Sequence, residues 1–175
     1  MNTLFKKYFL LIFLCPFCGS LSAQQNAEQE ANLKAAFIYN FTKYIDWGSY
    51  EHGNDFIIAV AGESPITQSL QEIARTSRVD DKIMIIKKVA RPSDIDDCNI
   101  LFITKECRYP LDFLLKKAGP GVLTISEEDG FAERGTAFNF VILNDRLKFE
   151  ANLKAISSAG LKAGAQLLKL AIIVD

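Results

Sequence analysis

Histidine and cysteine, which often carry catalysis or bind metals, are few in this 175-residue chain, with one histidine and four cysteines. Its one histidine, His52, lies in the polar segment GSYEHGND with no cysteine beside it. A serine hydrolase would need that histidine, and the chain has no Gly-x-Ser-x-Gly elbow to supply the nucleophile. A tetrahedral zinc site needs more ligands than His52, Cys98 and Cys107 can provide. The sequence therefore predicts a solvated loop histidine, with no catalytic triad, metal site or cofactor.

Two segments of the sequence match the motifs of phosphate-binding and calcium-binding sites only in part. The turn at 61–64, Ala-Gly-Glu-Ser, lacks the three glycines of a dinucleotide fingerprint, and its glutamate would repel a phosphate. SEEDG (126–130) begins like a calcium loop but lacks the later ligands. Glu127 and Asp129 could do acid–base chemistry, which leaves an enzyme of another kind as an alternative. Acids in the first turn of a helix explain these carboxylates without any substrate.

Cys98 and Cys107 lie far from the N-terminal segment and raise the question of a disulfide. If CNILFIT (98–104) is a strand, its ends lie about 20 Å apart at roughly 3.3 Å per residue. A disulfide needs Cα atoms within about 7 Å, and a short turn cannot easily return Cys107 along the whole strand. We expect a buried thiol at Cys98, a free thiol at Cys107 and no disulfide, with a bridge as the alternative.

The first 23 residues have the composition of a secretory signal peptide. Two lysines precede an apolar run (9–21), and small residues at its end offer a cleavage site. The run is too short to span a bilayer comfortably. We predict cleavage after Ala23, and a lipid anchor on Cys18 is the competing interpretation.

Residues 24–175 are long enough for a single domain with its own core. Removal of the two signal-peptide lysines lowers the formal charge from −1 to −3, so electrostatics give no reason to expect nucleic acid. The C-terminal segment LLKLAIIVD is too short to insert into a membrane and contains a lysine. These features predict an exported protein of the periplasm.

Apolar runs alternate with helix signals along this domain. Strands are predicted at 56–62, 82–89, 98–104 and 121–126, and the first of these is a continuous apolar run that ends in glycine, as in a strand covered on both faces. Helices are predicted from Ser64-Pro65 to about Thr76 and over 110–118, because proline favours the start of a helix.

The pattern changes after residue 136. AFNFVILNDRLKFEAN (137–152) has two partly alternating runs around an Asn-Asp pair, which predicts a β-hairpin. A closing helix is predicted over 153–170, where Gly160 and Gly164 would allow close packing on the sheet or, alternatively, a dimer contact. The order of elements predicts an α/β fold: a layered, Rossmann-like domain with a mostly parallel sheet, helices on its faces, and a C-terminal β-hairpin followed by a helix.

The segment AAFIYNFTKYIDW (35–47) predicts an amphipathic helix that ends near Asp46. At 100° per residue, one side carries most of the large apolar residues together with an amide, and we expect that side to be buried: Leu33, Phe37, Asn40, Phe41, Tyr44 and Trp47. Tyr39 points the opposite way. A ligand-stacking aromatic surface is the alternative.

Ligands of parallel sheets bind beyond the carboxyl ends of the strands. Those ends are predicted at 62–64, 104–106 and 126–130. If the domain binds a small ligand, we expect five polar residues near this edge to contact it: Ser64, Thr104, Ser126, Glu127 and Asn139.

Four blocks resemble, in order, those of the YfiR-like family of periplasmic regulators: LKAAFIYNFTKYIDW (33–47), CNILFI (98–103), VLTISEEDGFAERGTAFNFV (122–141) and RLKFEANLKAISSAGLKAGAQLLKLA (146–171). The chain departs from the family at Gly135, where a second glycine often follows, and at Ala151, where isoleucine is common. Some members carry cysteines around the SEEDGFAERG loop. This chain has none there, so we expect no redox role for that loop.

The resemblance implies a non-enzymatic periplasmic protein, commonly a homodimer, that binds the periplasmic part of a membrane diguanylate cyclase. Such a regulator holds the cyclase inactive and lowers cyclic-di-GMP output, and an OmpA-like outer-membrane protein can sequester it. The alternative is a small-ligand sensor module that feeds a membrane histidine kinase. We expect Tyr39, Phe131 and Arg134 to contact the partner.

Overall fold

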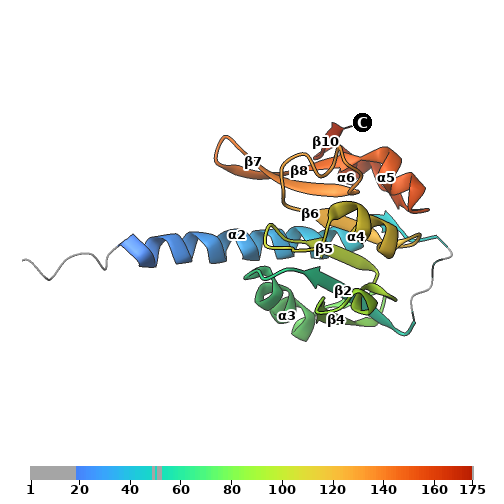
Figure 1. The fold of residues 1–175 in the computed structure, drawn as a ribbon, viewed down its shortest axis with the longest axis horizontal. Helices are drawn as coiled ribbons and strands as arrows, with labels where there is room; N and C mark the ends of the chain where they lie inside the picture. The colour runs from blue at the N-terminus through green and yellow to red at the C-terminus, as the bar shows by residue number, and fades with distance from the viewer. Residues whose placement is uncertain (1–18, 49, 51–52, 175) are drawn as a thin grey trace, which may run out of the picture.

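The computed structural model describes residues 19–48, 50 and 53–174 of the chain, and within them eight strands form one sheet. Residues 1–18, which hold most of the predicted signal peptide, lie outside that description. The strand order is β10-β8-β7-β6-β5-β2-β4-β3 (Figure 1). The bounds are β2 (Asp55–Ala61), β3 (Arg78–Val79), β4 (Lys82–Lys88), β5 (Ile100–Ile103), β6 (Leu123–Ser126), β7 (Phe138–Leu143), β8 (Arg146–Asn152) and β10 (Ile172–Val174).

Five neighbouring strands, from β4 through β2, β5 and β6 to β7, run parallel. All four residues of β5 are buried, as expected for a strand covered on both faces. β7 and β8 form an antiparallel hairpin whose turn residues, Asn144 and Asp145, have φ values of 51° and 57°. Two successive left-handed residues are typical of a type I′ turn. The predicted α/β fold, its mostly parallel sheet and its C-terminal hairpin are confirmed.

Helices cover both faces of the sheet. Alternate residues of β5 belong to two core clusters, because successive side chains of a strand point to opposite faces. Ile100 and Phe102 belong to the α2-side cluster, on the face covered by α2 (Gly19–Thr42) and α3 (Ile66–Thr76). Leu101 and Ile103 belong to the α4-side cluster, on the face covered by the 3₁₀ helix η1 (Pro92–Ile95) and α4 (Leu111–Ala118). The domain is therefore a three-layer sandwich, beyond which the first turns of α2 extend (Figure 1).

The opening helix differs from its prediction at both ends. α2 includes the polar residues 24–31 and ends at Thr42, four residues before the predicted end near Asp46. A short strand, β1 (Ile45–Asp46), follows and pairs with β9 (Lys162–Ala163). The segment after Thr42 is therefore extended, because its backbone pairs with the C-terminal region.

The buried side of α2 was also predicted wrongly. Its buried residues are Ala31, Lys34, Ala35, Ile38, Phe41 and Thr42. Leu33, Asn40 and Tyr44, which were expected to be buried, are exposed, while Phe37 and Trp47 are partly buried. The buried side is rotated by roughly one residue, or about 100°. Two alanines on it allow the helix to approach the sheet closely, so aromatic content was the wrong guide to its orientation.

The predicted closing helix is two short helices separated by an extended segment. α5 (Leu153–Ser158) ends before Gly160, whose φ of 74° is left-handed. β9 follows, then α6 (Ala165–Leu168) and the edge strand β10. The Gly164 backbone N–H donates to the Tyr44 carbonyl at 2.8 Å. Both glycines therefore lie at chain reversals or strand contacts, and neither belongs to a continuous closing helix.

The direction of chain connection reverses beside β2. The chain passes from β2 through α3 to β4 on one side of it, and then through η1 to β5 on its other side. In open α/β sheets a crevice forms at such a reversal, beyond the carboxyl ends of the strands. This arrangement points to the ends of β2, β4 and β5 as a place for a site.

Candidate functional site

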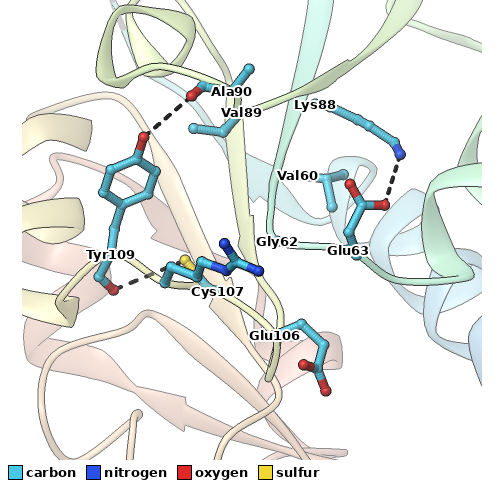
Figure 2. Close-up of a pocket in the computed structure, with 10 residues that line it drawn as sticks. Val60, Gly62, Glu63, Lys88, Val89, Ala90, Glu106, Cys107 and Tyr109 are labelled. Carbon is cyan, nitrogen blue, oxygen red and sulfur yellow. Dashed lines mark hydrogen bonds and ion pairs between the residues drawn. The ribbon is translucent and has the colours of Figure 1, made fainter.

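A cleft of about 560 Å³ opens at that reversal, and we call it the switch-point cleft (Figure 2). It is lined by Val60, Gly62 and Glu63 at the end of β2, by residues 88–90 at the end of β4, and by residues 106–109 after β5. The edge of the sheet expected from the sequence thus does hold a cavity. None of the five residues expected to contact a ligand lines it.

Gly62 brings the end of β2 against the segment that follows β5. Its φ is 105°, and a Cβ at this position would overlap the Thr104 Oγ1 and come within 2.7 Å of the Cys107 backbone nitrogen. The Cys107 N–H in turn donates to the Thr104 carbonyl at 3.1 Å. Only glycine fits this close approach, which sets one wall of the cleft.

Two polar contacts fix the other walls. The Lys88 ammonium and the Glu63 carboxylate form an ion pair of 2.8 Å, in which both side chains are largely exposed. The Tyr109 hydroxyl donates to the Ala90 carbonyl at 3.3 Å and joins the segment after β5 to the end of β4 (Figure 2). Three strand ends are therefore linked around one cavity.

The cleft contains a thiol that is not activated. Cys107 is half-buried, and burial raises the pKa of its thiol above the usual range. Cys98 lies fully buried under η1 and β5, and burial raises the pKa of its thiol to about 12. Both cysteines are free. Thiols with raised pKa values are protonated at neutral pH, so neither is a ready nucleophile or metal ligand. Within the described residues, no group of three acidic, histidine or cysteine side chains could hold a metal ion.

A buried ion pair lies at the same edge of the sheet, beyond β6. The Lys34 ammonium of α2 donates to the Glu127 carboxylate at 2.6 Å, and it also pairs with Glu30 at 2.5 Å. The other oxygen of Glu127 accepts the Lys105 backbone N–H at 3.2 Å. This pair connects the opening helix to the segments that follow β5 and β6.

Next to it, a buried polar network holds the loop between β6 and β7. The Ser126 hydroxyl donates to the side-chain oxygen Oδ1 of Asn139 at 2.7 Å and lies 2.8 Å from the Thr136 hydroxyl. The Asn139 amide donates to the Glu150 carboxylate at 2.9 Å. These hydrogen bonds satisfy groups that would be costly to bury alone, so the network has a structural role.

The five residues expected to contact a ligand therefore do not line one pocket. Ser126 and Asn139 are fully buried and bonded to each other. Thr104 is buried behind Gly62, and its hydroxyl has no hydrogen-bond partner among the described residues. Ser64 and Glu127 both line a shallow pocket of about 210 Å³ beside α2, although the Ser64 hydroxyl also accepts the Ile66 N–H at the start of α3.

The residues expected to contact a partner lie at two places. Arg134 stacks on Phe131, with 5.0 Å between the guanidinium carbon and the ring centre, and Phe131 packs against the α4-side cluster. Tyr39 packs against the α2-side cluster and is half-buried instead of pointing freely outward. Its hydroxyl lies 3.4 Å from the Arg78 carbonyl, and the Lys43 ammonium sits over its ring.

A second cavity, of about 370 Å³, lies between α2 and α6, and we call it the α2–α6 groove. Phe37, Tyr44, Phe149 and Leu170 are among its lining residues. Tyr44 and Leu170 are exposed, and Leu170 has 68% of its surface free. The side of α2 that was expected to be buried thus forms part of an open apolar surface.

Sequence reasoning did not single out Lys88, Arg108 or Tyr109 of the switch-point cleft. A signal for them existed, because Lys88 lies at the end of one predicted strand and Arg108 and Tyr109 closely follow another. It was missed because the strand order was not known, and only that order places the ends of β4 and β5 on either side of β2.

Comparison with known proteins identifies a family that this chain matches. A model of the YfiR/HmsC-like family matches residues 31–172. The crystal structure of a conserved domain protein from Vibrio cholerae O1 biovar El Tor strain N16961 is similar at a TM-score of 0.55 and 9% sequence identity. That match covers 83% of this chain but only 60% of the Vibrio chain, and at such low identity it shows a shared fold alone.

Across residues 19–48, 50 and 53–174, no helix combines the length and the apolar composition that a bilayer-spanning segment requires.

The family match extends from the buried face of α2 to the edge strand β10. Because it covers most of the sequence, the chain belongs to the YfiR/HmsC-like family.

Proposed function

We propose that this protein is a periplasmic regulator that binds the periplasmic part of a membrane diguanylate cyclase and represses it. The observation that carries this proposal is the family match over residues 31–172, since regulation of such cyclases is what the YfiR-like family suggests. The signal-peptide composition of residues 1–23 supports a periplasmic location.

Repression requires unequal binding to two conformations of the cyclase. A bound protein shifts a two-state equilibrium only as far as its affinities for the two states differ. A tenfold decrease in the ratio of active to inactive cyclase therefore requires about tenfold tighter binding to the inactive state, or about 1.4 kcal/mol. An OmpA-like outer-membrane protein that competes for the regulator would release the cyclase.

Two surfaces are suited to the partner. One is the Phe131–Arg134 pair, where a guanidinium stacked on an aromatic ring is a frequent type of interface anchor. The other is the α2–α6 groove, where exposed apolar side chains surround a cavity. Tyr39 is a weaker candidate because its ring and hydroxyl already contact groups of the same chain.

Deletion of the gene should raise cyclic-di-GMP, and affinity capture from solubilised membranes should recover a cyclase.

Arg134→Glu and Leu170→Asp test the two surfaces, and Arg146→Glu and Leu143→Asp are matched controls at exposed positions of the β7–β8 hairpin. We expect one test variant to raise cyclic-di-GMP while both controls repress normally. Unchanged cyclic-di-GMP on deletion, together with no cyclase in the captured material, would refute the proposal. Capture of a sensor kinase would favour the alternative pathway.

A further inference from the structure

We infer that the switch-point cleft binds a small carboxylate with an apolar body, held by the Arg108 guanidinium. This inference goes beyond the proposed function, because it concerns the isolated protein and needs no cyclase. The cleft shares no lining residue with the α2–α6 groove, so the two surfaces can be tested separately.

The size and lining of the cleft suit a small metabolite. Its volume of about 560 Å³ lies inside the range of roughly 300–1,000 Å³ that is typical of small-molecule pockets. Val89, Cys107 and Tyr109 are half-buried and pack against the α4-side cluster, so they give the cleft an apolar wall. A ligand with an apolar body would cover that wall and remove it from water.

The charges that line the cleft are unevenly paired. Lys88 is already paired with Glu63. The Glu106 carboxylate points away from that pair and from Tyr109 (Figure 2). Among the ion pairs and hydrogen bonds of the described residues, none involves the Arg108 side chain. A guanidinium presents two parallel N–H groups that match the two oxygens of a carboxylate, so a carboxylate is its best complement.

Contacts within the chain hold the walls of the cleft together. Gly62 holds the segment after β5 against the end of β2, and the Tyr109–Ala90 hydrogen bond holds it against the end of β4. A ligand would therefore bind without ordering these three strand ends first, which lowers the entropic cost of binding.

Cys107 provides a reporter inside the cleft. Its thiol is half-buried among the lining residues, whereas Cys98 is fully buried. Alkylation by iodoacetamide requires the thiolate and access to the sulfur, so the reaction is run at mildly alkaline pH, where a bound molecule should slow it at this residue. Peptide mass mapping assigns the label to Cys107 and separates it from the other cysteines of the chain.

The experiment measures the rate of Cys107 alkylation in the full protein with three kinds of probe. Phenylacetate, 3-phenylpropionate and hexanoate carry both a carboxylate and an apolar body. Acetate and inorganic phosphate carry charge alone, and phenylacetamide carries the body alone. We expect at least one apolar carboxylate to slow labelling roughly tenfold at ten times its dissociation constant, because about nine molecules in ten are then occupied. The other three probes should have little effect.

Variants assign the effect to Arg108. Arg108→Ala should abolish protection, Arg108→Lys should retain only part of it, and Arg146→Ala on the hairpin should leave it unchanged, with all three melting like the wild type. Thermal shift with the same probes gives a second readout that does not depend on Cys107. The inference is overturned by labelling that no apolar carboxylate slows, by equal protection from phosphate or phenylacetamide, or by protection that survives in Arg108→Ala.

Discussion

Lys34 on α2 and Glu127 after β6 form an ion pair of 2.6 Å in which the side chains are only 8% and 10% exposed. Taking two charges out of water is costly unless each is paired and hydrogen-bonded. Here Glu30 also pairs with the lysine, and the Lys105 backbone N–H donates to Glu127. The opening helix is therefore joined to the sheet by a contact that is sensitive to the loss of either partner.

Replacing Lys34 by methionine should destabilise the protein by about 3–5 kcal/mol, because it leaves the Glu127 carboxylate buried without a counter-charge. Urea unfolding followed by circular dichroism measures this change. The matched control is Lys88→Met, since the Lys88–Glu63 pair has a similar length but is largely exposed. We expect that control to lose about 1 kcal/mol or less. The double replacement of Lys34 by methionine and Glu127 by glutamine should recover part of the loss, and equal losses in the two single variants would contradict this prediction.

The same ion pair should produce a specific pH dependence. Burial alone would lower the pKa of Lys34, but hydrogen bonds to Glu127 and Glu30, with the charges of both, outweigh it and raise the pKa above 10.5. Because the folded pKa is the higher one, the stability from protonated Lys34 is present below the unfolded value and is lost as pH rises through the folded pKa. The difference in unfolding free energy between wild type and Lys34→Met should be constant from about pH 7 to 9 and shrink above about pH 10.5. Growth of that difference in alkali would show that the sign is wrong.

The orientation of α2 can be tested with two leucine-sized residues. Ile38 is fully buried, whereas Leu33 is 48% exposed. Ile38→Ala should cost about 2–5 kcal/mol, because it removes packed methyl groups and leaves a cavity. Leu33→Ala should change stability by about 0.5 kcal/mol. The reverse order, measured by urea unfolding, would restore the helix face predicted from the aromatic pattern.

Gly62 should tolerate no side chain, because a Cβ would be crowded by neighbouring atoms in addition to straining the backbone. Gly62→Ala adds a Cβ that meets the Thr104 hydroxyl and the Cys107 backbone, in a residue with φ of 105°. We expect a loss of about 3 kcal/mol from combined strain and overpacking. Gly130→Ala is the control, because Gly130 also has positive φ, 76°, but a Cβ added there would meet no atom of the described residues within 4 Å. It should lose about 1 kcal/mol, and a similar loss at both positions would mean that the crowding around Gly62 is unimportant.

The parallel strands and the hairpin could be predicted from the sequence because their signals are local. β2 is a nearly continuous apolar run, β4 holds four apolar residues in succession at 83–86, and the Asn144–Asp145 pair satisfies the turn with left-handed backbone angles. The break in the closing helix could not be predicted in the same way. Its cause is a contact distant in sequence, the hydrogen bond from Gly164 to the Tyr44 carbonyl, which replaces a helical bond.

The site was predictable as a location and not as a set of side chains. The strand-end rule correctly directed attention to the edge that holds Gly62 and Glu106. It could not show that Ser126 and Asn139 are turned inward and bond to each other. That outcome depends on the antiparallel β8, which places Glu150 beside Asn139 and completes a buried network.

The two margins of the sheet are unusually brief. β3 contributes two residues at one margin and β10 contributes three at the other. Each covers only part of its neighbour, since β3 pairs with Lys82 and Ile83 of β4 and β10 pairs with residues 150–152 of β8. The two short strands themselves offer a foreign strand few backbone groups, which is one way in which proteins limit edge-to-edge association. Growth of a cross-β fibre should therefore not begin at β3 or β10, and the outer sides of residues 84–88 and 146–149 are where an added strand would have to pair.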